Sequence, residues 1–258
     1  MEKTIKELQR IKQNTNLNYS VKTSVEDFTQ KIFNTLFDDS IDIAESFGAL
    51  ENLFKTAAKI SCLSTSEECS KNWIVFSEKL PLILEDLNRD AQYFMESDPA
   101  ARRLEEIYFA YPGFYALAIH RMSHEIYNQN LHLFARLMSE YAHRQTGTDI
   151  HPGATIKAPI FIDHATGIVI GETCVIEPQV KIYQGVTLGA LSISKDKQNI
   201  KRHPTVKSNV CIYANATILG GDTVVGEHSI IGGNVWVTKS VPENSIVYNT
   251  IEANIKTR

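Results

Sequence analysis

The segment FIDHATGIVIGETCVIEPQVKI, residues 161–182, carries isoleucine at every sixth position over most of its length. Ile170, Ile176 and Ile182 keep this spacing, whereas the step from Ile162 to Ile170 is eight residues. A period of six fits neither the 3.6 residues of a helical turn nor the two-residue alternation of a single strand. It indicates short strands separated by corners, with an interruption beside Asp163 and His164.

The same spacing extends over most of the C-terminal half of the chain. It places a branched aliphatic residue at thirteen positions: 150, 156, 162, 170, 176, 182, 188, 206, 212, 218, 225, 231 and 237. A small or β-branched residue mostly stands two positions before each of them. Three such strands form one coil of a triangular parallel β-helix, in which each repeat packs on its neighbours.

The repeat is interrupted three times. The first interruption adds two residues before Ile170, the second is the polar run of residues 189–203, and the third adds one residue near Gly220. Function tends to reside where a regular scaffold is interrupted.

The first 145 residues follow a helical period instead. Phe47, Leu50, Phe54 and Ala57 form one apolar stripe, and a longer one begins at Trp73 and includes Leu84. Pro81 predicts a kink or a restart within the longer stripe. The string SDPA at residues 97–100 predicts a helix start capped by Asp98.

The predicted fold class is therefore α+β. Residues 1–145 form an N-terminal all-α helical domain, and residues 146–248 form a C-terminal parallel β-helix of hexapeptide repeats with an excursion loop at 189–203. Residues 249–258 form a short C-terminal tail.

Composition narrows the function classes. A formal net charge of −4 argues against nucleic acid or an anionic membrane as the main partner. The charged N-terminus lacks the apolar core of a signal peptide, and no stretch approaches the roughly 18 apolar residues of a membrane span. Four cysteines without disulfide or metal-ligand spacing indicate reduced thiols and a cytoplasmic location.

His164 is the first candidate for chemistry. It is either a histidine that packs in a tight corner or a general base, which needs a partner to hold it. Asp149 lies fifteen residues earlier, so successive coils could bring its carboxylate to the imidazole.

Several other charged, histidine and cysteine residues are candidates for function, but each also has a purely structural interpretation. Lys195, Lys197, Lys201 and Arg202 form either a solvated loop or a cationic flap for an anionic ligand, and His203 follows them. His120 and His124 could form half of a metal site but are expected to be surface or core histidines. Cys174 is expected to be a small core residue.

Five strings, in this order, carry a family resemblance: DPA (98–100), DIHPGA (149–154), DHATGIVIGET (163–173), QGVTLG (184–189) and RHP (202–204). On these strings the chain resembles the serine O-acetyltransferases of cysteine biosynthesis, and with the helical half the resemblance covers nearly the whole chain. It implies a left-handed β-helix and transfer of an acetyl group from acetyl-CoA to L-serine, with no metal.

The resemblance also implies residue roles. His164 would be the general base and Asp149 its partner. Asp98, Asp163, Arg202 and His203 would hold the amino acid, which would make Asp98 a ligand as well as a helix cap. Small residues would line the acetyl-CoA groove, namely Gly189, Ala190, Ala214 and Gly233.

Assembly and regulation follow from the resemblance too. It implies a homotrimer or a dimer of trimers with active sites between β-helices, and feedback inhibition by L-cysteine. Many members read GGTGK where this chain has GALSISK, and well-known members end in an isoleucine that binds O-acetylserine sulfhydrylase. Because this chain ends in Arg258, no tight complex of that kind is expected.

Three alternatives stay open. One is a hexapeptide-repeat acetyltransferase with another small hydroxyl or amino acceptor. A second is a metal lyase on a β-helix, which needs three converging histidines among His151, His164, His203 and His228. The third is a trimeric scaffold without catalytic activity.

Overall fold

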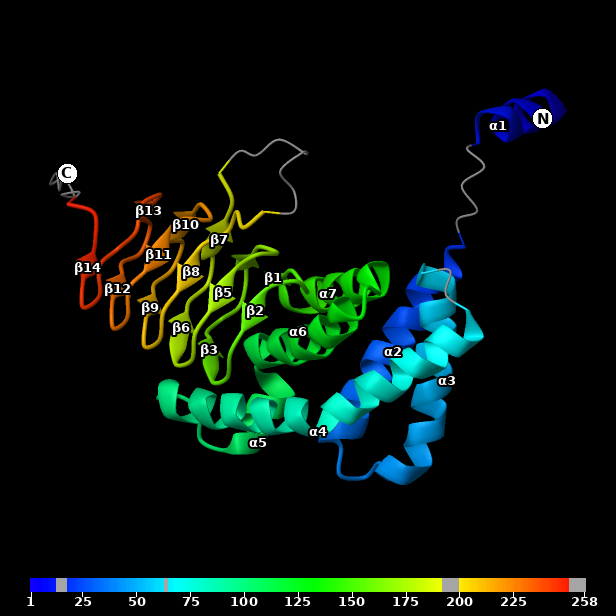
Figure 1. The fold of residues 1–258 in the computed structure, drawn as a ribbon, viewed down its shortest axis with the longest axis horizontal. Coiled ribbons are helices and arrows are strands. Elements are labelled where there is room, and N and C mark those ends of the chain that lie inside the picture. The colour runs from blue at the N-terminus through cyan, green and yellow to red at the C-terminus, as the bar shows by residue number, and fades with distance from the viewer. Residues whose placement is uncertain (13–17, 63–64, 192–199, 251–258) are drawn as a thin grey trace, which may run out of the picture.

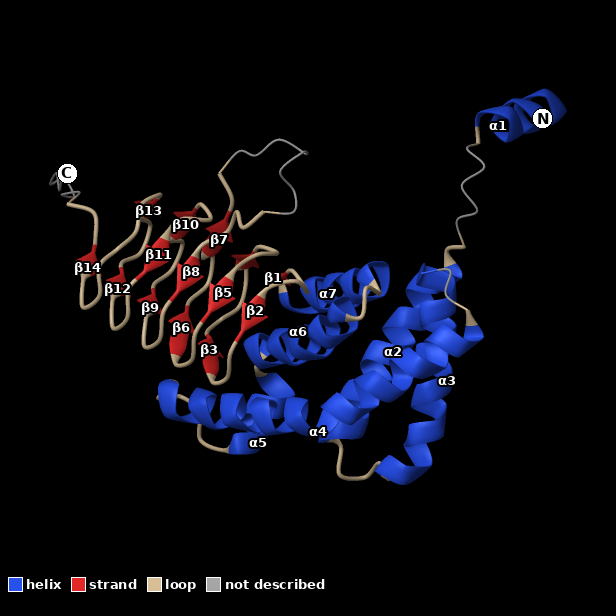
Figure 2. Ribbon diagram, viewed as in Figure 1, coloured by secondary structure: helices blue, strands red, loops and turns tan. Residues whose placement is uncertain are grey.

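A computed structural model describes residues 1–12, 18–62, 65–191 and 200–250 of the chain. Helices fill the N-terminal half, and a stack of short strands fills the C-terminal half (Figures 1 and 2). The helices are α1 (Glu2–Ile11), α2 (Ser20–Phe37), α3 (Ile43–Cys62), α4 (Ser66–Ser97), α5 (Leu104–Ala110), α6 (Pro112–Asn128) and α7 (His132–Thr146).

The strands form three parallel sheets, which are the three faces of a triangular prism. The first sheet has the order β1 (Asp149–Ile150), β4 (Val169–Ile170), β7 (Thr187–Gly189), β10 (Thr217–Leu219) and β13 (Trp236–Val237). The second contains β2 (Thr155–Ile156), β5 (Val175–Ile176), β8 (Thr205–Val206) and β11 (Val224–Val225). The third contains β3 (Ile160–Ile162), β6 (Val180–Ile182), β9 (Cys211–Ile212), β12 (Ile230–Ile231) and β14 (Ile246–Val247).

The six-residue pattern is the core of this prism. All thirteen aliphatic positions of the pattern are buried. In the first sheet, Ile150 pairs with Ile170, Ile170 with Leu188, and Leu188 with Ile218. Each coil thus places its branched side chain directly on that of the coil below, which confirms the predicted β-helix.

The three interruptions lie at corners of the prism. Along the first sheet Asp149 pairs with Val169, twenty residues on, whereas Val169 pairs with Thr187 after the regular eighteen. The step from Thr187 to Thr217 is thirty residues and that from Thr217 to Trp236 is nineteen. Every extra residue therefore leaves the prism between strands, and the strands keep their register.

One prediction for the helical half needs correction. The helix start at SDPA is wrong, because α4 ends at Ser97, Asp98 is its C-terminal cap, and α5 begins only at Leu104. The Asp98 carboxylate accepts the N–H of Ala100 at 2.8 Å, which stabilises a turn in place of a helix start.

Of the kink or restart predicted at Pro81, the structure has the kink, because α4 continues through this residue. Figure 1 shows the two parts of α4 running in different directions, as expected for a proline kink. Just after this point Ile83 is buried in place of Leu84, which is only partly buried, whereas Leu87 and Ala91 are buried as the predicted stripe requires.

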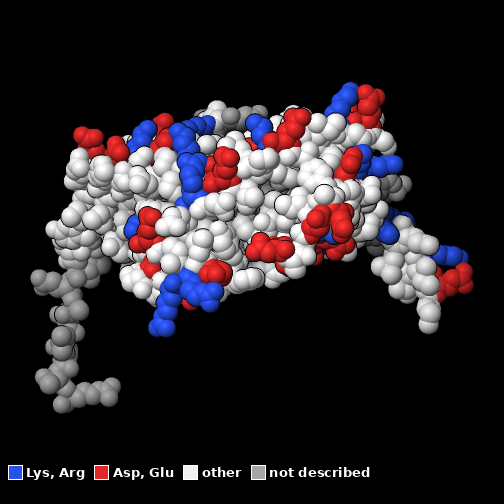
Figure 3. Space-filling model, turned by 90° about the horizontal axis from the view of Figure 1, so that it is seen from below, with Lys and Arg blue, Asp and Glu red and all other residues white. Residues whose placement is uncertain are grey.

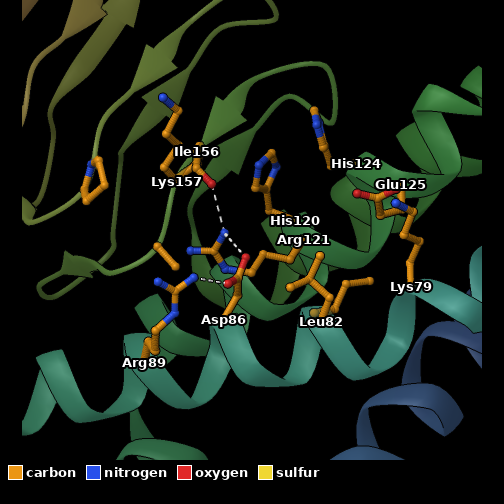
Figure 4. Close-up of a pocket in the computed structure, with 13 residues that line it drawn as sticks. Lys79, Leu82, Asp86, Arg89, His120, Arg121, His124, Glu125, Ile156 and Lys157 are labelled. Carbon is orange, nitrogen blue, oxygen red and sulfur yellow. Dashed lines mark hydrogen bonds and ion pairs between the residues drawn. The ribbon is translucent and has the colours of Figure 1, made fainter.

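A buried ion pair fastens the helical half to the first coil. Arg121 of α6 donates from Nε and Nη2 to the Asp90 carboxylate of α4, at 2.6 and 2.9 Å. The same guanidinium donates to the carbonyl of Ile156, and Asp90 accepts the backbone N–H of Ile160, both at 2.9 Å. Figure 4 shows Arg121 extending from α6 to Ile156 and to Asp86. Two helices and two strands therefore meet at one pair of charges.

A close contact beside this pair depends on glycine. A Cβ added at Gly113 would lie 2.1 Å from the carbonyl oxygen of Ile162. Only glycine lets α6 approach the end of β3 this closely. Ile162 directly precedes Asp163 and His164, so the helix is packed against the base of the interrupted corner.

One face of the molecule shows how its charges are distributed. On the face that Figure 3 shows, acidic and basic side chains are interspersed instead of forming one basic patch. In the part of the chain that the structure describes, no helix combines the length and apolar character needed to cross a bilayer.

We predict that Asp90→Ala lowers the free energy of unfolding by about 3–5 kcal/mol, because it leaves the Arg121 charge buried without its partner. The double variant Asp90→Leu/Arg121→Met should lose much less. Urea unfolding measures both, with Lys71→Ala as the control, since the exposed Lys71–Glu67 pair is worth less than about 1 kcal/mol. A loss for Asp90→Ala no larger than that of the control would contradict the prediction.

Candidate active site

His164 lies in the corner between β3 and β4, where the first interruption leaves the prism. Its side chain is 67% exposed, so the imidazole does not pack in the core. His164 and Ala165 both adopt left-handed backbone conformations, with φ of 57° and 63°. Two consecutive residues of this kind are unfavourable for side-chain-bearing residues and tend to occur at functional sites.

Two carboxylates approach this corner from different parts of the chain. Asp163 Oδ1 lies 3.6 Å from His164 Nδ1, too far for a hydrogen bond. Asp98, at the end of α4, accepts the hydroxyl of Tyr111 at 2.6 Å. Burial, the bond to Asp98 and the charges of Asp98, Glu106 and Asp163 raise the pKa of Tyr111 to about 12. Asp98 and Asp163 therefore lie in one electrostatic neighbourhood.

Asp149 lies on the same side of the prism but does not contact His164 in the described chain. Its Oδ1 lies 3.6 Å from Nη1 of Arg136, which also pairs with Glu140. Ligand atoms of Glu140, His143 and Asp149 come within 4.8 Å of one another. Because the Arg136 guanidinium lies against both carboxylates, an internal cation already balances this cluster.

Arg202 and His203 lie on another edge of the prism, between β7 and β8. The guanidinium of Arg202 pairs with Glu172, which also accepts the hydroxyl of Tyr127 at 2.6 Å. Burial acts to raise the pKa of Glu172, but the bonds from Tyr127 and Arg202 and the nearby positive charges lower it overall. An ionised glutamate thus holds the arginine in place.

His203 is held as a neutral imidazole. Burial, the neighbouring Arg202 and further positive charges lower its pKa to about 4. Its Nδ1 accepts the backbone N–H of Thr173 at 3.1 Å, so the proton of the neutral ring is on Nε2. The ring packs where Gly171 has no side chain, since a Cβ there would lie 2.0 Å from its Cδ2. His203 can therefore donate one hydrogen bond from Nε2.

The predicted site residues thus divide between two edges of the prism. We call the corners between the third and first sheets the His164 edge, and those between the first and second sheets the His203 edge. Asp149, Asp163 and His164 belong to the former, with Asp98 beside them; Arg202 and His203 belong to the latter.

The predicted groove residues divide in the same way. Ala214 and Gly233 lie on the His164 edge, stacked on successive coils, where a Cβ on Gly233 would lie 3.1 Å from the Ala214 carbonyl. Gly189 and Ala190 lie on the His203 edge, at the end of β7. Lys195, Lys197 and most of the excursion loop fall outside the described residues.

The structural interpretation, as core residues, is confirmed for Cys174 and His120. Cys174 is buried, its thiol lies 3.5 Å from the carbonyl of Leu188, and burial raises its pKa to about 12. His120 is 2% exposed, and burial lowers its pKa well below the usual value. Both are core residues.

The metal-lyase alternative finds no support within the described chain. His164 lies on one edge, His151 and His203 lie on a second, and His228 follows β11 on the third. Within one chain, the three histidines that such a site needs do not converge.

Three residues with a place in this geometry were missed in the sequence. Glu172 lies inside the string DHATGIVIGET without an assigned role, and Tyr111 falls within the helical half, where the sequence assigns it none. Tyr127 carried no signal at all. All three act through contacts between distant segments, which no spacing within one segment reveals.

An interrupted hexapeptide β-helix with an exposed histidine at the interruption defines the class of hexapeptide-repeat acyltransferases. No protein-family model matches the chain. A serine acetyltransferase of Staphylococcus aureus is 42% identical over 166 residues, covering 64% of this chain and 75% of that protein. The structure of serine acetyltransferase 1 from Entamoeba histolytica, in complex with L-cysteine, is 33% identical with a TM-score of 0.80, covering 90% of this chain and 97% of that one. The chain belongs to the serine acetyltransferase family.

Other relatives match over a shorter part of their length. A plasmid-encoded serine acetyltransferase of Synechococcus elongatus is 49% identical over 187 residues, which is 70% of this chain. The chain spans 58%, 51% and 50% of the length of three cyanobacterial relatives.

We predict that His203 makes the fold sensitive to acid. Its pKa is about 4 when folded, below the roughly 6.5 of an unfolded histidine, so the unfolded chain binds more protons between these values. The free energy of unfolding should therefore fall as the pH falls from about 6.5 to about 4. Urea midpoints across this range should decline less steeply for His203→Gln, with His151 retaining part of the effect because burial lowers its pKa too. Parallel pH profiles would refute this.

Proposed function

We propose that this protein transfers the acetyl group of acetyl-CoA to the hydroxyl of L-serine, giving O-acetyl-L-serine and CoA, as the first step of cysteine biosynthesis. The observation that carries the proposal is the exposed His164 in a left-handed corner, beside the carboxylate of Asp163. The names of the relatives, serine acetyltransferases at 42–49% identity, support the same acceptor and reaction.

In this mechanism His164 removes the serine hydroxyl proton as the oxygen attacks the thioester carbonyl. The tetrahedral intermediate collapses, the carbon–sulfur bond breaks, and the imidazolium returns the proton to the CoA thiolate. Asp149 is the proposed partner of His164, which requires its carboxylate to turn from Arg136 towards the imidazole when substrates bind. Apo geometry does not exclude such a shift.

Charge complementarity assigns the ends of the amino acid. Asp98 and Asp163 would bind the serine ammonium group, and the Arg202 guanidinium, with its planar fork of donors, would bind the carboxylate. The Nε2–H of neutral His203 would stabilise the substrate carboxylate or the oxyanion. Gly189, Ala190, Ala214 and Gly233 would let the CoA chain approach the backbone.

These roles require two chains. Within one chain the proposed base and the proposed carboxylate site lie on different edges of the prism. We propose that the His164 edge of one protomer faces the His203 edge of the next, which produces a closed homotrimer, or a dimer of such trimers joined through the helical domains at residues 1–145.

Regulation and partners extend the proposal. The Entamoeba histolytica relative was solved with L-cysteine, so L-cysteine is the proposed feedback inhibitor. The tail at 251–258 lies outside the described residues, and the absence of a tight sulfhydrylase complex stays a prediction. The cytoplasm is the proposed compartment, because the cysteines show no disulfide pattern.

The direct test follows CoA thiol release from acetyl-CoA with L-serine, in parallel with other small hydroxyl and amino acceptors. We predict that His164→Ala, which removes an exposed side chain, keeps the unfolding midpoint and lowers kcat on the order of 10²–10⁴-fold. His228→Ala, at an exposed position on the third edge, is the matched control. Near-normal turnover by His164→Ala would exclude it as the base, and preference for another acceptor would replace L-serine.

The shared site makes a separate prediction. His164→Ala and Arg202→Ala should each be inactive alone. Trimers formed by refolding the two variants together should recover about a quarter of wild-type turnover. Random mixing leaves about a quarter of the sites with an intact His164 edge from one protomer and an intact His203 edge from the next. Two aliquots of the same variant refolded together are the control. No recovery in trimers shown to contain both variants would place the whole site within one chain.

A further inference from the structure

We infer that Tyr111 is a positioning residue that holds Asp98 in the orientation that receives the amino group of the substrate. The inference rests on the proposed function and adds to it a residue outside the family strings. Tyr111 is the residue between α5 and α6, thirteen residues after Asp98.

The Asp98 carboxylate is held at both oxygens. Oδ1 accepts the backbone N–H of Ala100 at 2.8 Å, and Oδ2 accepts the Tyr111 hydroxyl at 2.6 Å. The first bond is local to the turn after α4, whereas the second comes from a different segment, thirteen residues on. Together they fix the rotation of a side chain that lies at the end of a helix, where a carboxylate would otherwise sample several rotamers.

The Tyr111 ring is itself held by packing. Pro112 follows it, which restricts Tyr111 to the extended backbone that it adopts as the N-cap of α6. Its ring meets Phe94 edge to face at 6.1 Å between centroids, and Phe94 meets Phe161 at 4.9 Å. Phe161 lies in β3, two residues before Asp163, so one run of rings connects the hydroxyl that holds Asp98 with the strand that directly precedes Asp163.

The hydroxyl remains a donor throughout the working pH range. Burial and the bond to Asp98 raise the pKa of Tyr111 to about 12, so the phenol stays protonated. A hydrogen bond to a charged group is stronger than one between neutral groups. It also takes one lone pair of the carboxylate and leaves the others oriented for an ammonium group.

The chain supplies a matched control in Tyr108, on the same segment. Tyr108 packs edge to face on Phe114 at 5.2 Å, and its hydroxyl donates to Asn88 at 3.2 Å. It makes no hydrogen bond to Asp98 among the described residues. Tyr108→Phe and Tyr111→Phe therefore each remove one hydroxyl and keep the ring, but only the second releases Asp98.

The test measures thiol release by full-length wild type, Tyr111→Phe and Tyr108→Phe. Tyr111→Phe should raise KM for L-serine about tenfold, with kcat within about threefold and KM for acetyl-CoA unchanged, because the lost bond acts on substrate binding. Tyr108→Phe should match wild type in all three. In an Asp98→Asn background, Tyr111→Phe should add little, as expected for two residues that act through one interaction.

A substrate analogue separates positioning from a general structural effect. 3-Hydroxypropanoate lacks the ammonium group, so its inhibition constant against L-serine should be the same for wild type and Tyr111→Phe. An equal loss of affinity for L-serine and for the analogue would overturn the inference, as would an unchanged KM for L-serine. In either case an active wild type leaves the proposed function intact, whereas a wild type without serine-dependent thiol release would overturn both.

Discussion

The buried ion pair between Asp90 and Arg121 determines how the two halves of the chain meet. Each member also bonds to the backbone of the first coil, at Ile160 and Ile156, so neither α4 nor α6 can slide along the β-helix without leaving a charge unpaired in the interior. Since Asp98 caps the end of α4 and α6 begins beside Tyr111, this one contact sets where both residues lie relative to His164. A site assembled from both halves depends on it.

The β-helix imposes a second constraint, because its repeat does not accommodate extra residues within the strands. Because aliphatic side chains stack from coil to coil, extra residues can be accommodated only at corners. Two of them lift His164 out of the core into a corner with two left-handed residues, and a longer insertion ends at Arg202 and His203. The regular coils absorb the strain of these corners, because their packing fixes the backbone on either side.

The period of six was sufficient to predict the β-helix, since a pattern repeated over thirteen positions reports a structure that is itself periodic. The same reasoning located the three interruptions. It failed for single contacts between distant segments: Asp98 was taken for the start of a helix, and Tyr111 and Glu172 were given no role. A polar side chain in an irregular turn forms hydrogen bonds with groups that the fold brings near it from distant parts of the chain, and the spacing of residues in the sequence does not reveal these groups. The family strings pointed to Asp98, but not to what holds it.

The division of the site between two edges has an energetic consequence on the proposed function. The His164 edge presents the carboxylates of Asp98 and Asp163, and the His203 edge presents the Arg202 guanidinium. An amino acid is a zwitterion, so its ammonium group matches one edge and its carboxylate the other. A ligand that contacts two protomers at once binds their assembly more tightly than either chain alone, and by linkage it stabilises that assembly. Substrate and inhibitor amino acids would therefore bind at the same interface between protomers. They would compete for that site, and each would stabilise the association of the protomers, for the same geometric reason.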